Sequence, residues 1–320
     1  MELKITAGHA VKYSRISCFL RELSKNRTLF LMTLPAVVLI TILCYLPMFG
    51  IVLAFKNFTF IKGFFGSEWV GFKNFEYLFT SSYAFIITRN TILYNLCFII
   101  LGTILSLFIA IALNELHNKK LSRLYHSCTF LPFFLSWVVV SYLLFSFLSI
   151  DKGFVNVGIL KFFGIEAINW YVEPKYWPFI ITFCSCWKNL GYSSIIYMAG
   201  LMGIDQEYYE SAVVDGATKW QQITKITIPH MSTMMCILVL LATGNIFRSD
   251  FGLFYQVPLN TGALYDVTNV LDTYVFRSLT RIGDIGMAAA AGFYQAVVGF
   301  VLVLAANLTV KKIDDSKSLF

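Results

Sequence analysis

Between two long apolar runs of this chain lies a polar stretch, Asp205-Gln-Glu-Tyr-Tyr-Glu-Ser-Ala-Val-Val-Asp-Gly-Ala-Thr-Lys-Trp-Gln-Gln-Ile-Thr-Lys-Ile-Thr-Ile-Pro229. Its first residue, Asp205, is a good N-cap, and Glu207 in the following turn suits the positive end of a helix dipole. Asp215-Gly216 is a turn signal, because glycine adopts positive φ without steric cost. The first half of the stretch therefore predicts a short helix that ends in a sharp turn.

The second half carries another helix start. Thr218 with Gln221 three residues later is a capping-box pattern, and Pro229 predicts the end of that helix. The stretch is expected to fold as helix, turn, helix between two apolar segments.

The composition indicates a membrane protein. Of 320 residues, 58% are hydrophobic and 13% are charged, whereas a soluble domain carries about 25% charged residues. A span needs about 20 apolar residues. Six windows meet this length, the last of them only if Lys188 is tolerated, and they predict six spans: Thr28–Phe55, Asn90–Asn114, Leu124–Ile150, Ile226–Phe247, Ile285–Val310 and Tyr176–Ile204.

The basic residues predict the orientation. With the N-terminus in the cytosol, the inner segments hold fourteen Lys and Arg residues and the outer loops hold eight. This excess favours cytosolic N- and C-termini and places residues 205–229 in the cytosol. The net charge of +7 is then mainly a topology signal, and no basic cluster suggests nucleic-acid binding.

The polar stretch resembles the "EAA" loop of the permease subunits of bacterial ABC importers. The matching positions are Glu210-Ser211-Ala212, Asp215-Gly216-Ala217, Trp220 and Ile228-Pro229. Ser211, Ile223, Ile228 and Ser232 depart from the family pattern, but the Asp-Gly turn is kept. The resemblance implies an all-α integral membrane protein of the type I importer fold, with six transmembrane helices and a cytosolic coupling helix.

This resemblance also implies a division of the chain. Residues 1–27 and 311–320 would be cytosolic tails, 28–82 the first span with an aromatic outer loop, and 83–310 the permease core with its coupling loop at 205–229. Gly71-Phe72-Lys73-Asn74-Phe75 and Arg89-Asn90-Thr91 resemble further family elements. Arg89 either snorkels to the outer interface or contacts the solute.

Partners follow from the same resemblance. The permease would pair with a second homologous permease, two copies of an ABC ATPase, and an extracytoplasmic solute-binding protein, in the bacterial plasma membrane. No Walker A motif occurs in the chain, so ATP and Mg²⁺ would bind the ATPase and this subunit would be no enzyme. The residues expected to couple to the ATPase are Tyr208, Tyr209, Glu210, Ala212, Asp215, Gly216 and Ala217. Glu210 is alternatively a solvated surface charge.

A subgroup of these permeases imports oligosaccharides or their uronic-acid derivatives, and Asp250-Phe-Gly-Leu-Phe254 and Asp272-Thr-Tyr274 resemble it. Rings and amides suit sugars. The residues expected to line the solute path are Trp187, Lys188, Asn189, Tyr192, Asn245 and Gln295. Because a charge within a span costs about 2.5–3.5 kcal/mol, Lys188 should either line the path or pair with a carboxylate of a partner subunit.

Other function classes find less support. A secondary transporter or channel is the alternative, but no Asp or Glu falls in the middle of a predicted span. The seven cysteines and four histidines have no metal-ligand spacing, and no acid–base cluster suggests a membrane enzyme.

Overall fold

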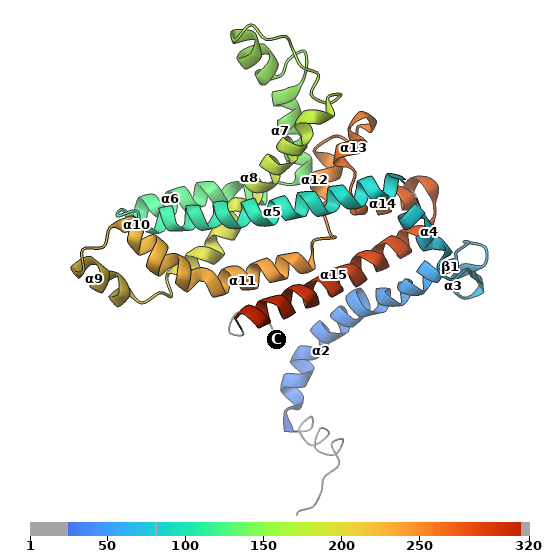
Figure 1. Cartoon of the computed structure of the whole chain (residues 1–320). Coiled ribbons are helices and arrows are strands. Elements are labelled where there is room, and N and C mark those ends of the chain that lie inside the picture. Colours follow the sequence, from blue (N-terminus) through green and yellow to red (C-terminus); the bar gives the residue numbers. More distant parts are fainter. Residues whose placement is uncertain (1–24, 81, 315–320) are drawn as a thin grey trace, which may run out of the picture. The chain divides into compact units, whose positions relative to one another are not determined.

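The computed structural model of the chain describes residues 25–80 and 82–314. Two compact units make up the chain, residues 1–52 and residues 53–320 (Figure 1). Most of the predicted tail 1–27 and residues 315–320 of the predicted tail 311–320 lie outside the described residues.

The first unit carries the predicted first span. Helix α2 (Arg27–Ile40) runs into a π-helical turn (Thr41–Tyr45) and then a 3-10 segment (Leu46–Phe55). Pro47 has no N–H to donate, so it cannot make a regular α-helical hydrogen bond. The π-helical turn just before it lets the neighbouring backbone groups hydrogen-bond to other residues. None of the most apolar 18 residues of this helical segment is buried in the protein, as expected of a helix that faces lipid or another subunit.

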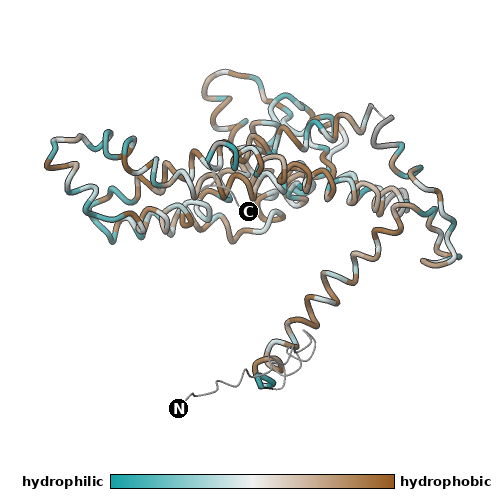
Figure 2. The backbone as a smooth tube through the Cα atoms, turned by 60° about the horizontal axis from the view of Figure 1, so that its bottom comes forward, coloured by the Kyte–Doolittle hydropathy of each residue, from teal (hydrophilic) through white to brown (hydrophobic). Residues whose placement is uncertain are grey.

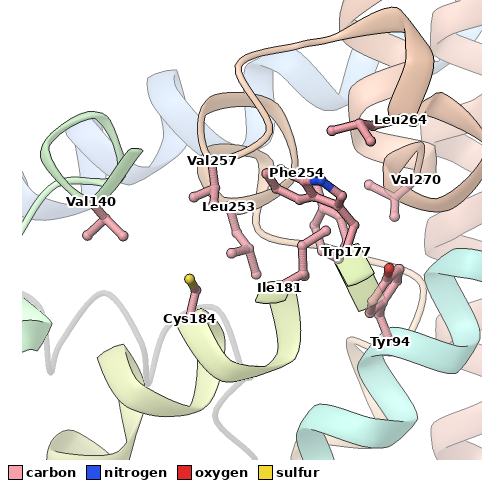
Figure 3. Packing of buried hydrophobic residues seen from close by; sticks show 10 residues of the cluster. All are labelled: Tyr94, Val140, Trp177, Ile181, Cys184, Leu253, Phe254, Val257, Leu264 and Val270. Atoms are coloured by element: carbon pink, nitrogen blue, oxygen red, sulfur yellow. The ribbon is translucent and has the colours of Figure 1, made fainter. Parts of the chain in front are cut away.

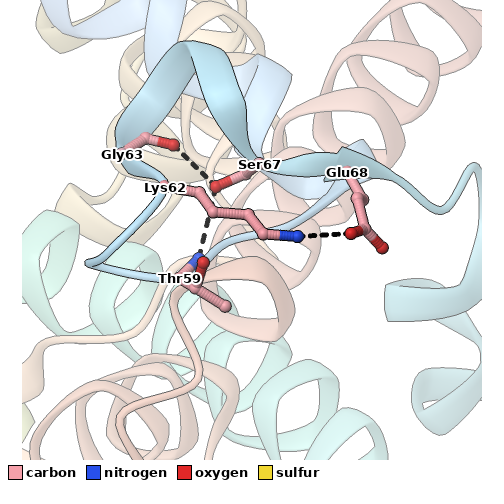
Figure 4. Close-up of polar contacts among 5 residues, drawn as sticks. All are labelled: Thr59, Lys62, Gly63, Ser67 and Glu68. Carbon is pink, nitrogen blue, oxygen red and sulfur yellow. Dashed lines mark hydrogen bonds and ion pairs between the residues drawn. The ribbon is translucent and has the colours of Figure 1, made fainter.

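The second unit begins with a small hairpin. Strand β1 (Lys56–Asn57) pairs antiparallel with β2 (Glu68–Trp69), and α3 (Gly63–Gly66) lies in the connection. Figure 4 shows Ser67, whose Oγ donates to Gly63 O at 2.6 Å, and the ion pair between Lys62 and Glu68. The hydrogen bond from Lys62 lowers the pKa of the Glu68 carboxyl.

The Gly71–Phe75 element fixes this outer loop. Gly71 has a positive φ of 62°, a value that favours glycine. Asn74 Nδ2 then donates to Ala54 O at 2.9 Å and to Lys56 O at 3.0 Å, and the Phe75 ring lies 6.1 Å from that of Phe293. The element therefore joins the hairpin and α4 (Lys73–Thr80) to α15 (Ile285–Ile313).

Long helices form the core of the second unit: α5 (Ser82–Asn114), α8 (Trp177–Leu201), α11 (Ile228–Gly244) and α15. Helix α5 packs along α8, and α11 packs against α15. Figure 2 shows hydrophobic residues along these helices and hydrophilic residues gathered at the end of the unit that carries α9 (Gln206–Val214) and α10 (Lys219–Gln222). This distribution is typical of a helix bundle that spans a membrane.

A buried cluster joins one end of the bundle to the segment that follows α11. Figure 3 shows side chains of α5, α7 (Trp137–Leu148) and α8 gathered around those of residues 253–270. Trp177, Ile181, Leu253, Val257 and Val270 are fully buried. The segment after α11 is thus folded onto the bundle, as short helices: α12 (Phe251–Gln256), Gly262–Leu264, α13 (Tyr265–Thr268), α14 (Leu271–Arg277) and Ser278–Ile282.

Glycine and alanine let α15 approach its neighbours. Ala290 and Ala291 are fully buried. A Cβ added to Gly299 would lie 2.8 Å from Gly244 O, and one added to Gly286 would lie 2.7 Å from Asn74 Nδ2. These close approaches need residues without a large side chain.

The predicted span at Leu124–Ile150 is not a single straight helix. Helix α6 (Lys119–Phe130) with the 3-10 turn Leu131–Phe134 is followed by α7 (Trp137–Leu148), and the two parts are bent by 99°. Leu135 is extended, and Ser136 starts α7 by accepting Val139 N at 3.3 Å. Pro132 and this new N-cap break the helix despite its uniform hydrophobicity. The chain then forms two short turns, Val155–Leu160 and Pro174–Tyr176, before α8.

The predicted count of six spans is not confirmed. Among the described residues, four helices have the length and hydropathy of a span, and the broken pair α6–α7 would be a fifth. Helix α8 has 25 residues but fails this test, because Lys188, Asn189 and several serines lower its mean hydropathy.

Candidate functional site

The 205–229 loop folds locally as its sequence predicts. Helix α9 (Gln206–Val214) starts at Asp205, whose Oδ1 accepts Glu207 N at 3.2 Å. Gly216 turns the chain with a φ of 77°. Helix α10 (Lys219–Gln222) then begins with the predicted capping box, in which Thr218 N donates to Gln221 Oε1 at 2.7 Å.

The second helix of the loop does not end at Pro229, so that prediction is wrong. Helix α10 continues through a π-helical turn (Ile223–Thr227) into α11, and Lys219–Gly244 forms one helix of 26 residues. Pro229 lies in the first turn of α11, and the wider turn before it accommodates the missing N–H and the ring. The loop is therefore joined to the bundle by uninterrupted helix.

Side chains also tie α9 to the bundle. The Tyr209 hydroxyl hydrogen-bonds to Thr227 Oγ1 at 2.9 Å, and the Tyr208 ring lies 5.0 Å from that of His230. Lys219 Nζ forms an ion pair with Glu115 Oε2 at 2.9 Å, at the end of α5. These contacts hold the loop against the ends of both α5 and α11.

An apolar surface remains exposed on the loop. Val214 is 87% exposed, Trp220 72% and Tyr208 53%. Ala212 and Ala217 are half-buried, whereas Glu210, Asp215 and Gly216 are exposed, and within the described residues the Glu210 carboxylate forms no ion pair. Tyr209 is half-buried, and its hydroxyl binds Thr227. Val214, absent from the predicted contact set, is more exposed than Tyr208.

Two adjoining cavities lie between α5, α8 and α11. The larger, of about 360 Å³, is lined by Asn95, Phe98, Ile99, Gly102, Thr103, Ser193, Ile196, Tyr197, Leu238, Ala242, Asn245 and Arg248. The smaller, of about 240 Å³, shares four of these residues and adds Ser106, Ser185, Cys186, Asn189, Leu190 and Asp250. Amides, hydroxyls and rings thus face two neighbouring cavities in an otherwise apolar bundle, and such a lining suits a sugar.

Of the six residues predicted to line the path, the structure brings two to these cavities, Asn189 and Asn245. Trp187 and Tyr192 are partly exposed elsewhere on α8, and the Tyr192 ring stacks on Phe133 at 4.7 Å. Gln295 is buried, and its Nε2 donates to Phe247 O at 2.8 Å and to Asp272 Oδ2 at 3.3 Å. Its role is to hold the end of α11 to α14 and α15.

Lys188 does not line either of these two cavities. It is 9% exposed, and its Nζ donates to Phe133 O at 2.7 Å. The same ammonium lies 5.3 Å from the ring centres of Phe133 and Trp137. Phe133 is in the last turn before the break between α6 and α7, where carbonyls lose their helical donors. Lys188 therefore stabilises the broken helix through a charge-assisted hydrogen bond and cation–π contacts.

Sequence reasoning missed the other cavity residues, above all Asn95 and Arg248. Asn95, Arg248 and Asp250 all lie in or near the sequence motifs that resemble the family, so the sequence did mark these regions. It could not show that they line a cavity, because the lining depends on how three helices face one another. Arg89, for which two roles were open, lines neither cavity; its Nη2 donates to Asn90 Oδ1 at 3.0 Å beside an apolar cavity of about 330 Å³. No group of three metal-ligating side chains occurs among the described residues.

Comparisons with known proteins identify the architecture. The family described as "Binding-protein-dependent transport system inner membrane component" matches residues 99–315. The polygalacturonan/rhamnogalacturonan transport system permease protein YteP of Bacillus subtilis is 31% identical over 92% of this chain and 91% of its own length. Protein LplB of the same organism is 31% identical over 97% of this chain and 95% of its own.

The fold is similar to a solved structure. A chain of a bacterial alginate ABC transporter, crystallised with a periplasmic protein that holds an alginate pentasaccharide, superimposes with a TM-score of 0.83. The two chains are 30% identical, and the match covers 93% of this chain and 98% of the other.

Proposed function

The chain belongs to the family of binding-protein-dependent transport system inner membrane components, and we propose that it forms half of the translocation path for an acidic oligosaccharide. It is a permease subunit of a sugar ABC importer. This assignment favours an ATP-driven importer over the secondary transporter or channel considered as an alternative.

One observation carries the mechanism: the second half of the exposed loop and the cavity wall are parts of the same helix. Lys219–Gly244 begins at α10 and includes Leu238 and Ala242 of the larger cavity. The hydrogen bond from Tyr209 joins α9 to the start of this helix, and the ion pair from Lys219 joins α10 to the end of α5. A displacement of α9 would therefore shift the cavity wall instead of being absorbed by a flexible linker.

The partner for this loop, in our proposal, is an ABC ATPase that binds ATP and Mg²⁺. Its cleft would take the exposed apolar residues Val214, Trp220 and Tyr208, with Ala212 and Ala217 beside them and Glu210 at the rim. Asp215-Gly216 would fix the angle of α9. Two ATPase copies would serve this chain and a second homologous permease in the cell membrane, with both termini cytosolic.

The proposed solute follows from the cavity and from the relatives. Hydroxyls, amides and rings line the space, and relatives are named for polygalacturonan and alginate, which are polymers of uronic acids. An extracytoplasmic solute-binding protein would deliver the oligosaccharide, and the alginate transporter, crystallised in complex with a pentasaccharide-bound periplasmic protein, supports this route.

The experiment places a photo-reactive amino acid at Val214 in the assembled transporter and identifies what it captures. The proposal expects cross-links to the ATPase subunit, and more of them when ATP is bound. Phe162, which is 83% exposed in the segment predicted to face outside, is the matched control and should not reach the ATPase. Capture of the ATPase from Phe162 and not from Val214 would overturn both the coupling role and the orientation.

A further inference from the structure

Arg248 is the charged residue in the lining of the larger cavity, within the part of the chain that the structure describes. It follows the end of α11, is exposed, and lines the same space as Asn95, Tyr197 and Asn245. Its guanidinium gives a positive charge to a lining that otherwise consists of amides, hydroxyls, rings and apolar side chains.

The nearest carboxylate in the sequence does not neutralise Arg248. Asp250 Oδ1 accepts Gly252 N at 2.9 Å and Leu253 N at 3.3 Å, and its Oδ2 accepts Trp137 Nε1 at 2.6 Å. Three N–H groups of this chain thus already share its charge. Asp250 acts as the N-cap of α12 and as a tie to α7.

A second carboxylate, Asp272, feels the charge of Arg248 but is also occupied. Asp272 Oδ2 accepts Ser249 N at 2.7 Å and Gln295 Nε2 at 3.3 Å. Burial raises the pKa of its carboxyl, and the charge of Arg248 opposes that rise. Within the described residues, the guanidinium of Arg248 has no ion pair within 4.0 Å and no hydrogen bond. Its five N–H donors are therefore available to a ligand in the cavity.

We propose that Arg248 binds a uronate carboxylate of the passing oligosaccharide and so selects acidic over neutral solutes. This inference rests on the proposed function, since it assigns a residue to the same path. Arginine suits the task because its planar donors match a carboxylate with two parallel hydrogen bonds. The sugar ring would face Tyr197 and Phe98, which line the same cavity. The position of Asp250 in the adjoining cavity restricts the carboxylate to the Arg248 side, because like charges repel.

The test measures equilibrium binding of trigalacturonate, and of its trimethyl ester, in which all three carboxylates are esterified, to the purified transporter complex without its solute-binding protein. Arg248→Gln keeps a polar side chain and removes the charge, whereas Arg248→Lys keeps the charge. We expect Arg248→Gln to bind trigalacturonate about tenfold to a hundredfold more weakly, and Arg248→Lys to be weakened less. The uncharged methyl ester should bind both variants as it binds the wild type.

Other results of this binding test would contradict the role proposed for Arg248. Equal losses for trigalacturonate and its ester in Arg248→Gln would show a packing role and overturn the inference, and so would unchanged binding of both. Uptake by the wild-type complex with its solute-binding protein separates the two proposals. If the wild type imports acidic oligosaccharides but Arg248→Gln binds trigalacturonate as the wild type does, only the Arg248 assignment fails; if the wild type imports only neutral sugars or no oligosaccharide, the proposed function fails as well.

Discussion

Replacing Gly216 tests whether the angle of α9 transmits force. Gly216 has a φ of 77° and is exposed, and an added Cβ would meet no atom within 4 Å. The cost of a side chain here is therefore conformational and not steric. A left-handed backbone costs an L-residue about 1–2 kcal/mol, and a β-branched residue lies at the upper end. Gly216→Val should raise the population of misdirected α9 conformations by a factor of about 5–30.

The assay is ATP hydrolysis by the complete transporter in lipid nanodiscs, with and without the loaded solute-binding protein. Gly216→Val should lose most of the solute-stimulated rate while the complex still assembles, because the substitution clashes with nothing. Gly216→Asn is the matched control, since Asn tolerates positive φ, and it should stay near the wild-type rate. Normal stimulation in Gly216→Val, or an equal loss in Gly216→Asn, would refute the reasoning.

Three further perturbations address the bundle. Lys188→Met should lower the stability of the complex by about 1–3 kcal/mol, because it leaves Phe133 O buried without its donor. If the variant melts like the wild type but fails to import, Lys188 contacts the solute instead. Gly191→Ala should lower the stability of the complex by about 1–3 kcal/mol, because its Cβ would lie 2.3 Å from a backbone oxygen of α6. Gly102→Ala is the control, since its Cβ meets nothing within 4 Å, and it should melt like the wild type. Equal melting temperatures for the two variants would show that α6 and α8 are not in contact. Burial raises the pKa of Asp272, so its carboxyl contributes most stability below its ordinary pKa and less as pH rises toward the raised value. Melting curves between about pH 4 and pH 7 should therefore depend less on pH in Asp272→Asn, and identical pH profiles would contradict the burial argument.

The family and the local structure of the 205–229 loop could be predicted because their causes lie within a few residues. The N-cap at Asp205, the capping box at Thr218 and the positive φ at Gly216 depend on neighbours one to three positions away. Such interactions form whatever the rest of the chain does. The apolar windows likewise located the long helices, because the length of a span is fixed by the bilayer.

The candidate path was predicted only in part. Asn189 and Asn245 are in the cavities, but Lys188 and Gln295 serve the fold. All four are polar residues on apolar helices, so composition could not separate them. What separates them is the direction each side chain takes once the helices pack, and this depends on contacts between residues distant in sequence.

The sequence by itself determined that the chain is a helical membrane protein with a polar helix–turn–helix loop, since periodicity, caps and hydrophobic length act locally. The tertiary structure alone decided that the third apolar window breaks at Ser136, that Lys188 satisfies Phe133 O from 55 residues away, and that the loop continues past Pro229 into the cavity wall. Local patterns allow either a break or a continuous helix at such prolines and caps, and the carbonyl of Phe133 finds its donor only because α8 folds against it.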